Sequence, residues 1–297
     1  MANTYLSAVY LPTVDSEESF LMSSPNTRLV GVYNSYYPFG IFKNLSKKPY
    51  IECTPITILY GGNGSGKSTL LNIVAEKLQL TRQSPYSKTD FFDDYCERCR
   101  IEGNVIPRES KIITSDDIFR RLSDIHIING SIDERRDEIN NRLDNIMHNL
   151  RVDENFGKLH GLDDLDRFKE LNAARHGSKS KFLRERTHQN LKSRSNGETA
   201  IEYLTDQIHD NALYLLDEPE NSLSPAMQLE FKKFIEESAR FFQCQFIIAT
   251  HSPLLLACKD ATIYNLDFNP VRQCQWNELE NVKTYARFFK ERMSEFE

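Results

Sequence analysis

Long hydrophobic runs are missing from this 297-residue chain, and their absence argues against a membrane-embedded subunit. No apolar stretch approaches the roughly 18 residues that a membrane-spanning helix needs. The N-terminal residues, MANTYLSAVYLP, lack both a basic region and a long apolar core, so a secretory signal is not expected. We therefore expect a cytoplasmic protein with no membrane partner.

Basic charge is scarce relative to acidic charge. The chain holds 37 lysines and arginines against 43 aspartates and glutamates, which leaves a net charge of −6. This balance does not favour nucleic-acid binding, although a local patch can still provide it. Such a patch lies between Arg175 and Arg194, where seven basic residues accompany a single acid, Glu185. A run of this kind is usually a solvated helix face; the alternative is contact with the phosphates of ATP or of a nucleic acid.

Cysteine is too scattered to suggest a disulfide framework. The six cysteines occur without a signal sequence, so their thiols are expected to stay reduced. Only Cys96 and Cys99 have the spacing of metal ligands. A structural zinc site needs a second pair, and none lies nearby in the sequence, which leaves the role of these two residues open.

The stretch Ile56–Thr69, ITILYGGNGSGKST, matches a phosphate-binding loop at every fixed position. It reads as a short strand, a glycine-rich loop and the start of a helix. Glycines let backbone N–H groups converge on phosphate oxygens, and the helix N-terminus adds favourable charge. Lys67 is predicted to reach the β- and γ-phosphates, and Ser68 to bind Mg²⁺. The predicted nucleotide-binding residues are Gly62, Asn63, Gly64, Ser65, Gly66, Lys67, Ser68 and Thr69.

Two acids end a later apolar strand, Ala212–Leu216. Asp217 is predicted to hold the Mg²⁺ of a bound nucleotide, usually through water, and Glu218 to polarise the attacking water. Two carboxylates after a strand can otherwise be a simple strand exit. Because they follow a phosphate loop, they indicate hydrolysis of a Mg-nucleotide.

Strands and helices alternate in the second half of the chain, which predicts a parallel sheet covered by helices. Residues 1–55 read as short strands of an antiparallel layer, and residues 81–108 as an exposed excursion. We predict one α/β domain with a core lobe at about 1–80 and 205–297 and a helical insertion lobe at about 81–204. The other expected strands are Lys111–Thr114, Gln245–Ala249 and Ala261–Leu266. The expected helices are Leu70–Leu80, a helix capped by Ser115-Asp116-Asp117 and running through Leu122, a helix opened by a capping box at Ser131 and ending near Leu150, Gln228–Arg240 and Tyr285–Met293.

Three further motifs resemble those of ATP-binding-cassette ATPases. Asp217–Pro225 resembles the acidic strand end and D-loop, with Ser222, Leu223 and Ser224 as the D-loop residues. Ser195-Asn196-Gly197-Glu198 resembles the signature motif, and Ile248–Ser252 resembles the segment of the switch histidine, here His251. With the phosphate loop, all four motifs occur in the order of that family, and the resemblance spans most of the chain outside residues 81–190.

In that family two ATPase units dimerise head to tail, with ATP between the phosphate loop of one unit and the signature of the other. The resemblance implies a homodimer or higher homo-oligomer in which Ser195 and Gly197 contact the γ-phosphate across the interface. It also implies that His251 contacts this phosphate in cis. The implied catalytic residues are Lys67, Glu218 and His251, and the implied fold is a P-loop NTPase with a mixed sheet like that of ATP-binding-cassette ATPases.

The branch of the family can be narrowed. Asp217–Asn221 looks more like RecF-type and OLD-family enzymes than like transporter ATPases. Residues 69–194 lack sustained heptads, so long coiled-coil arms are not expected. Only 46 residues follow His251, which is too few for the Toprim domain of OLD-family nucleases. The chain resembles the stand-alone AAA/ABC-type ATPases of bacteria.

Two features depart from the family pattern. No convincing glutamine links ATP to the lobe of the signature: Gln83 lies early, and Asp116, after a strand, is the substitute candidate for a metal ligand. Ser224 stands where the D-loop usually has aspartate. Phe39 and Phe42 lie at a suitable distance before the loop to stack on adenine, but aromatic residues there can equally belong to the core.

The leading hypothesis is an ATPase that uses Mg²⁺ with ATP as its substrate, dimerises around two nucleotides and switches a partner protein. One alternative is an ATP-gated nucleic-acid-binding module that uses Arg175–Arg194. Another is a nucleotide-binding scaffold that sequesters an effector with little turnover. A role in bacterial antiviral defence rests on family analogy alone.

Overall fold

The computed structural model describes residues 4–23, 36–45, 50–152 and 195–296. It divides into two compact units, one made of Met1–Phe119 with Asn196–Glu297 and the other of Arg120–Ser195. The expected lobe boundary after residue 80 is therefore displaced to Phe119, because the segment after residue 80 supplies a strand of the central sheet. The basic run Arg175–Arg194 lies outside the described residues.

A six-stranded mixed sheet forms the centre of the first unit, in the order β5-β6-β7-β3-β8-β9. The first five strands in this order run parallel, and β9 closes one edge antiparallel to β8. Every residue of β3 and β7 is buried, as expected for parallel strands covered on both faces. The strands are β3 (Ile56–Tyr60), β5 (Lys111–Thr114), β6 (Leu213–Asp217), β7 (Gln245–Ala249), β8 (Thr262–Asn265) and β9 (Arg272–Cys274).

A smaller antiparallel sheet has the strand order β2-β1-β4. It consists of β1 (Leu6–Tyr10), β2 (Tyr50–Glu52) and β4 (Arg100–Gly103). The predicted antiparallel layer is confirmed, although one of its strands comes from the segment expected to be an excursion. The Gln245 side chain on β7 joins the two sheets, since its Oε1 accepts from the Leu6 backbone N–H at 2.8 Å and its Nε2 donates to the Leu6 carbonyl at 2.7 Å.

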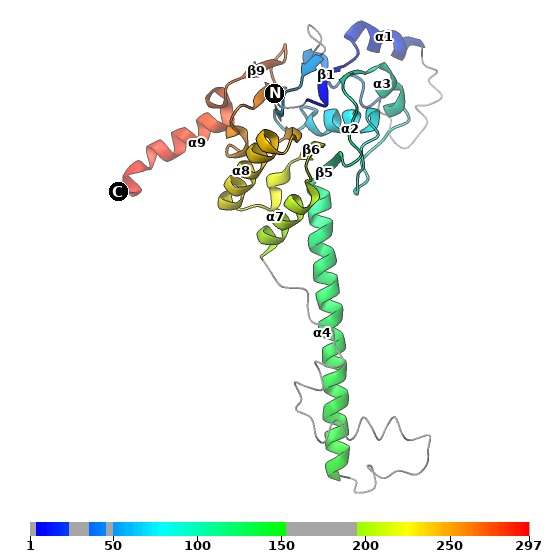
Figure 1. Cartoon of the computed structure of the whole chain (residues 1–297), viewed down its shortest axis with the longest axis vertical. Helices are drawn as coiled ribbons and strands as arrows, with labels where there is room; N and C mark the ends of the chain where they lie inside the picture. Colours follow the sequence, from blue (N-terminus) through cyan, green and yellow to red (C-terminus); the bar gives the residue numbers. More distant parts are fainter. Residues whose placement is uncertain (1–3, 24–35, 46–49, 153–194, 297) are drawn as a thin grey trace. The chain divides into compact units, whose positions relative to one another are not determined.

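Of the helices of the first unit, α2 packs against β5, β6 and β7 and α8 packs against β7, whereas α9 extends away from the sheets (Figure 1). α2 begins directly after the glycine-rich loop, and α8 buries Phe231 and Ile235 on its apolar stripe. These helices are α1 (Val14–Ser23), α2 (Lys67–Lys77), α3 (Phe92–Arg98), α7 (Asn196–Gln207), α8 (Pro225–Phe241) and α9 (Glu280–Glu291). Short 3₁₀ turns are η2 (Lys43–Leu45), η4 (Pro219–Ser222), η5 (Leu255–Ala257), η6 (Trp276–Glu278) and η7 (Met293–Glu295).

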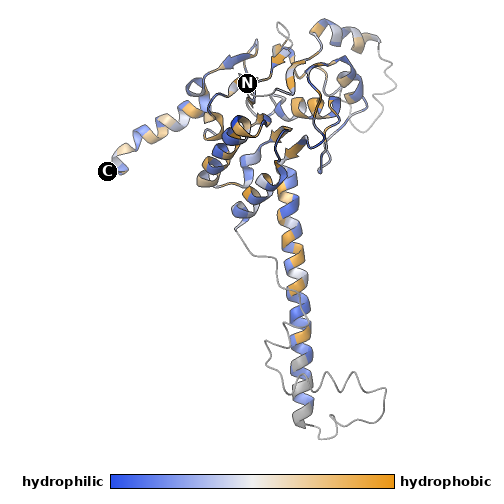
Figure 2. Ribbon diagram, in the orientation of Figure 1, coloured by the Kyte–Doolittle hydropathy of each residue, from blue (hydrophilic) through white to orange (hydrophobic). Residues whose placement is uncertain are grey.

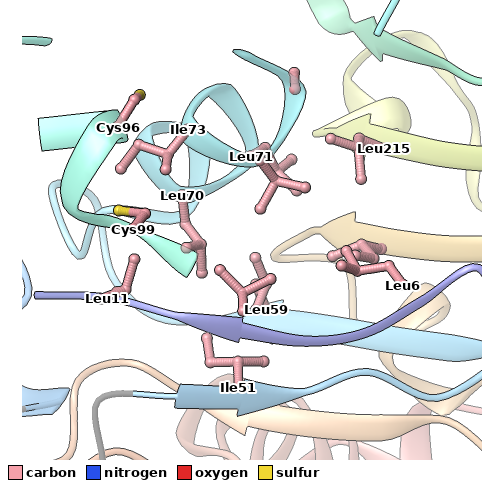
Figure 3. Close-up of a cluster of buried hydrophobic side chains, with 14 of the residues drawn as sticks. Leu6, Leu11, Ile51, Leu59, Leu70, Leu71, Ile73, Cys96, Cys99 and Leu215 are labelled. Carbon is pink, nitrogen blue, oxygen red and sulfur yellow. The ribbon is translucent and has the colours of Figure 1, made fainter. Parts of the chain in front are cut away.

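The prediction that residues 81–108 form an exposed excursion is wrong. Phe92, Tyr95 and Cys96 of α3 are buried, and Cys96 and Cys99 lie close to the α2 side chains Leu70 and Ile73 in the hydrophobic cluster of Figure 3. Burial raises the pKa of both thiols to about 12, so they are protonated core residues. Within the described ranges, no group of three or more histidine, cysteine or acidic side chains is arranged to hold a metal ion.

α4 (Ser115–Val152) is one continuous helix, so the predicted helix start at Ser131 is wrong. The Ser131 hydroxyl instead donates to the Ile128 carbonyl at 2.8 Å, within the helix. At the start of α4, the Thr114 backbone N–H and hydroxyl both donate to Asp117 Oδ2, at 2.8 and 3.1 Å. Hydrophilic residues are spread along the described length of α4 (Figure 2). Among the described helices, none is long and apolar enough to cross a membrane.

Candidate functional site

The glycine-rich loop between β3 and α2 requires glycine at its last position. Gly66 has φ +93°, and a Cβ there would lie 2.7 Å from Ile41 Cγ2 and 2.9 Å from Phe42 Cε1. Gly64 also has positive φ, at +81°. No side chain caps the N-terminus of α2, so its first backbone N–H groups remain available to an anion.

Lys67 is the buried cation of this loop, with 5% of its surface exposed. Its Nζ donates to the carbonyls of Gly61 and Gly62 at 3.0 and 3.2 Å. Burial lowers the pKa of Lys67, and the nearby carboxylates of Glu218 and Asp217 raise it again. The negative charge of a bound phosphate would stabilise the buried Lys67 ammonium in the same way as these carboxylates do.

Asp267 completes the loop and was not predicted from the sequence. Both of its carboxylate oxygens accept from the Gly62 N–H, at 2.9 and 2.8 Å. The residue follows β8, which pairs with β3 in the sheet, so the two strand ends lie side by side. An acid just after a parallel strand was the available signal, because such strand ends gather at one edge of the sheet.

Ser68 and Asp217 lie together as the metal ligands predicted from the sequence. The Ser68 hydroxyl donates to Asp217 Oδ1 at 3.0 Å. Burial raises the pKa of Asp217 to about 6, and a cation would offset that cost. A hydroxyl and a carboxylate are oxygen ligands of the kind that Mg²⁺ takes together with substrate phosphates, so the pair fits the ion.

The substitute metal ligand Asp116 is exposed on the first turn of α4. In the described part of the chain it makes no hydrogen bond or ion pair with Ser68 or Asp217. The neighbouring Asp117 is the buried acid of that turn and caps the helix. The role of Asp116 in metal binding stays a prediction.

Glu218 has a strained backbone that directs it toward His251. Its φ and ψ are 49° and 53°, the left-handed region that non-glycine residues rarely adopt. Its Oε2 accepts from Asn221 Nδ2 at 3.0 Å, and its Oε1 lies 3.8 Å from His251 Nε2. This leaves the carboxylate held at one oxygen and directed at the switch histidine with the other.

His251 Nε2 is buried and has no hydrogen-bond partner among the described residues. Burial lowers the pKa of His251, and the Lys67 charge lowers it further. The imidazole is therefore favoured in its neutral form at pH 7, in which one ring nitrogen donates and the other accepts. A nitrogen without a partner at this position suits a contact with a bound group.

The D-loop packs against the start of α7, where the signature motif lies. A Cβ on Gly197 would lie 2.6 Å from Met227 Sδ and 3.4 Å from the Ser222 carbonyl, so a larger residue there would require the Met227 side chain to move. Leu223 is buried, and Ser224 caps α8 by accepting from the Met227 N–H at 3.4 Å. Asn196 and Glu198 are exposed on the first turn of α7, and Ser195 belongs to the second unit.

Three further candidates have definite places. Gln83 Oε1 accepts from the Tyr203 hydroxyl of α7 at 3.0 Å, so Gln83 contacts the signature helix. Phe39 and Phe42 are 7% and 6% exposed, and both rings pack near Tyr95 in the core. Their burial supports the core alternative and not adenine stacking.

The structure thus gathers Lys67, Ser68, Asp217, Glu218 and His251 at the carboxyl ends of β3, β6 and β7. Their roles toward a nucleotide stay predictions. Sequence reasoning missed Asp267, and it also missed two residues that hold the His251 backbone, Glu220 and Asn281. Nothing in their spacing marked the last of these, because it lies 30 residues beyond the histidine.

Comparison with known proteins gives one family. The family model described as "AAA domain, putative AbiEii toxin, Type IV TA system" matches residues 84–257, more than half of the chain. A comparison with curated proteins finds no match.

Several solved structures are similar to the chain. One is an Smc head domain with an extended coiled coil, bound to the C-terminal domain of ScpA, from Pyrococcus furiosus; it is 16% identical with a TM-score of 0.40, over 80% of this chain and 95% of that one. Another is a dimeric ATP-binding cassette in a post-hydrolysis state bound to ADP and Pi, which is 12% identical with a TM-score of 0.35, over 76% and 88% of the two chains. A nucleotide-free ATP-binding cassette from an ABC transporter is 15% identical with a TM-score of 0.37, over 79% and 86%.

Proposed function

Because this chain belongs to the AAA-domain family described as a putative AbiEii toxin of a Type IV TA system, we propose that it binds ATP with Mg²⁺ and hydrolyses it. The observation that carries the proposal is the convergence of Lys67, Asp217, Glu218 and His251. A buried lysine, a half-buried carboxylate beside a hydroxyl and a second carboxylate beside a histidine are the parts that phosphoryl transfer to water requires.

The chain's own residues would divide the reaction as follows. The N–H groups at the start of α2 and the Lys67 ammonium hold the phosphates, and Ser68 with Asp217 holds Mg²⁺, which would neutralise phosphate charge when bound. Glu218 aligns the attacking water and accepts its proton, and His251 contacts the γ-phosphate. Catalysis then depends on positioning and charge stabilisation and not on a covalent intermediate.

The test is Glu218→Gln, which keeps the size of the side chain but removes its basicity. We expect ATP affinity close to that of the parent and a steady-state rate at least about 100-fold lower, the usual contribution of a general base. Lys67→Ala is the matched comparison, because it should abolish ATP binding itself. Parent-like turnover by Glu218→Gln would contradict the assignment of the base.

We also propose that two copies close head to tail over two nucleotides. The close packing of Gly197 against Met227 and the Ser222 carbonyl supports this proposal, because it places the start of α7 next to the D-loop that follows β6. In such a dimer Ser195 and Gly197 of one copy would face the nucleotide held by Lys67 of the other.

Turnover would switch a partner protein, and the family description makes bacterial defence the context that we propose for the switch. One alternative is an ATP-gated module that binds nucleic acid through Arg175–Arg194. The other is a nucleotide-binding scaffold that sequesters an effector and hydrolyses little ATP. Salt-dependent DNA or RNA binding that is lost on neutralising Lys179, Lys181, Arg184 and Arg186 would support the first of these. A steady-state rate that stays low with and without a co-purified partner would support the second.

A further inference from the structure

One carboxylate oxygen holds the whole turn that carries the switch histidine. Glu220 Oε1 accepts from the Thr250 hydroxyl at 2.6 Å, from the His251 N–H at 2.8 Å and from the Ser252 N–H at 3.1 Å. Glu220 belongs to η4, the turn that begins directly after Glu218. The residues after β7 are therefore fixed to the segment that carries the predicted general base.

The other side of the His251 backbone is held from the C-terminal helix. Asn281 Nδ2 donates to the His251 carbonyl at 2.7 Å, and Asn281 Oδ1 accepts from the Val282 N–H at 2.8 Å. α9 is seated beside the site by Leu279 and Val282, which are 1% and 5% exposed. The amide and the carbonyl of the histidine thus have separate partners from two different elements.

This two-sided hold controls where the imidazole points. His251 Nε2 lies 3.8 Å from Glu218 Oε1 and has no hydrogen bond of its own among the described residues, so the ring is not fixed by its tip. Its position follows from the backbone and from the edge-on contact with the Tyr60 ring at 6.4 Å. A reacting group misplaced by about 1 Å can lose about 100-fold in rate.

We propose that Glu220 and Asn281 are positioning residues that hold His251 in its place for hydrolysis. Neither touches the nucleotide in this proposal, and both act through the histidine backbone. Since Asn281 lies in the first turn of α9, the position of that helix would affect the rate of hydrolysis. The proposal rests on the ATPase function proposed above.

The kinetic test compares Glu220→Ala, Glu220→Gln and Asn281→Ala in the full chain. The two alanine variants should lower kcat about tenfold while the ATP dissociation constant stays within about twofold of the parent. Glu220→Gln should recover most of the rate, because its amide oxygen can still accept the three hydrogen bonds. The matched controls are Glu237→Ala on α8 and Thr284→Ala on α9, which are both exposed and take no part in the hydrogen bonds to the His251 turn.

Two kinetic results would overturn the proposal. One is parent-like kcat in both alanine variants, and the other is a loss that comes entirely from weaker ATP binding. Should Glu220→Ala fail to fold, Asn281→Ala still decides, because it removes only the bond to the His251 carbonyl and one to its own helix.

A second measurement separates this proposal from the ATPase function itself. Amide hydrogen exchange in nucleotide-free protein should show the His251 and Ser252 N–H groups protected in the parent and at least about tenfold faster in Glu220→Ala. Unchanged exchange of these two N–H groups in Glu220→Ala would overturn the proposal that Glu220 holds the His251 backbone, even if the protein hydrolyses ATP. A parent without ATPase activity but with this exchange pattern would overturn the proposed function and leave the hold intact.

Discussion

The carboxylates of the site differ in what surrounds them, and their surroundings set their roles. Asp217 is half-buried beside a hydroxyl, Glu218 lies near an imidazole, and one oxygen of Glu220 accepts from three donors. Asp267 is exposed and bound to a single N–H of the loop. In the proposed mechanism, these four acids near Lys67 therefore act as a metal ligand, a base, a positioning group and a loop anchor.

Asp267 offers a charge effect that can be separated from its hydrogen bonds. Asp267→Asn keeps an acceptor for the Gly62 N–H but removes a negative charge that acts on Lys67. We expect ATP to bind about threefold more tightly, because phosphates no longer meet that charge, and the gain should shrink at high salt. ATP titrations at two ionic strengths measure this.

The control for this variant is Asp260→Asn, an exposed residue with φ +58° that asparagine tolerates. It makes the same charge change in the loop that precedes β8, away from the phosphate loop. Equal effects of the two variants would assign the change to net charge and contradict the local explanation.

Glu17 on α1 gives a pH-dependent prediction about stability. The residue is 7% exposed, and burial raises its pKa above the usual value of 4.5 for a glutamate. The folded state therefore binds the Glu17 proton more tightly than the unfolded chain does. The stability that protonated Glu17 contributes is complete below the unfolded pKa and is lost as pH rises through the folded pKa. The difference in free energy of unfolding between Glu17→Gln and the parent should therefore favour the variant more at pH 8 than at pH 4.

Urea unfolding at the two pH values checks this difference. Glu18→Gln, an exposed neighbour on the same helix, serves as the control and should show much less change. A Glu17→Gln difference that does not depend on pH would contradict this prediction, because it would show that the hydrogen bonds from the Gly40 N–H and the Tyr95 hydroxyl fully offset the cost of burying the charge.

At the scale of elements, periodic or uniformly apolar segments were predictable and short ones were not. β6, β7 and α8 were expected close to their observed bounds, because burial on both faces or along one stripe shapes their sequences. α3 has only 7 residues, and the polar residues around it mask its helical pattern. Yet Phe91, Phe92, Tyr95, Cys96 and Cys99 are spaced as one helical face, and that pattern was the missed signal.

The helix α4 shows a different limit. A capping-box pattern at Ser131 predicts a helix start, but the same letters are compatible with a helix interior where the serine hydroxyl donates to a preceding carbonyl. The start of α4 after Lys111–Thr114 was predictable, whereas its continuation beyond Leu122 was not. Likewise the partners of His251 depend on how η4 and α9 meet β7, and spacing alone does not encode that.

The D-loop serine has a structural role that can be measured in its element. Ser224 is the N-cap of α8, followed by a proline at the first helical position. Ser224→Ala should destabilise the protein by about 1 kcal/mol, whereas Ser224→Asp, the residue usual in related D-loops, should keep the cap. Urea unfolding decides, with Ser19→Ala on α1 as an exposed control; equal stability of the alanine and aspartate variants would contradict a capping role.

At the scale of the whole molecule, the proposed assembly can be tested through the signature motif. The phosphate loop, the acids and the histidine meet within the first unit, and the start of α7 packs on the D-loop of the same unit. If the signature acts across an interface, no single copy has a complete site. The Glu218→Gln variant should then dimerise on adding ATP and Mg²⁺, which sedimentation velocity would detect, and a species that remains monomeric would contradict it.

Mixing two inactive variants tests this directly. Lys67→Ala lacks the cation of its own loop, and Ser195→Arg blocks the signature that it offers to a partner, so each alone should be inactive. In a mixed dimer, the intact Lys67 of one copy meets the intact Ser195 of the other, and one of the two sites is restored. We expect up to about half of the parent rate within mixed dimers. The control is Ser195→Arg mixed with the double variant Lys67→Ala/Ser195→Arg, which has no complete site and should remain inactive. If the mixture of the two single variants is equally inactive, the signature does not act in trans.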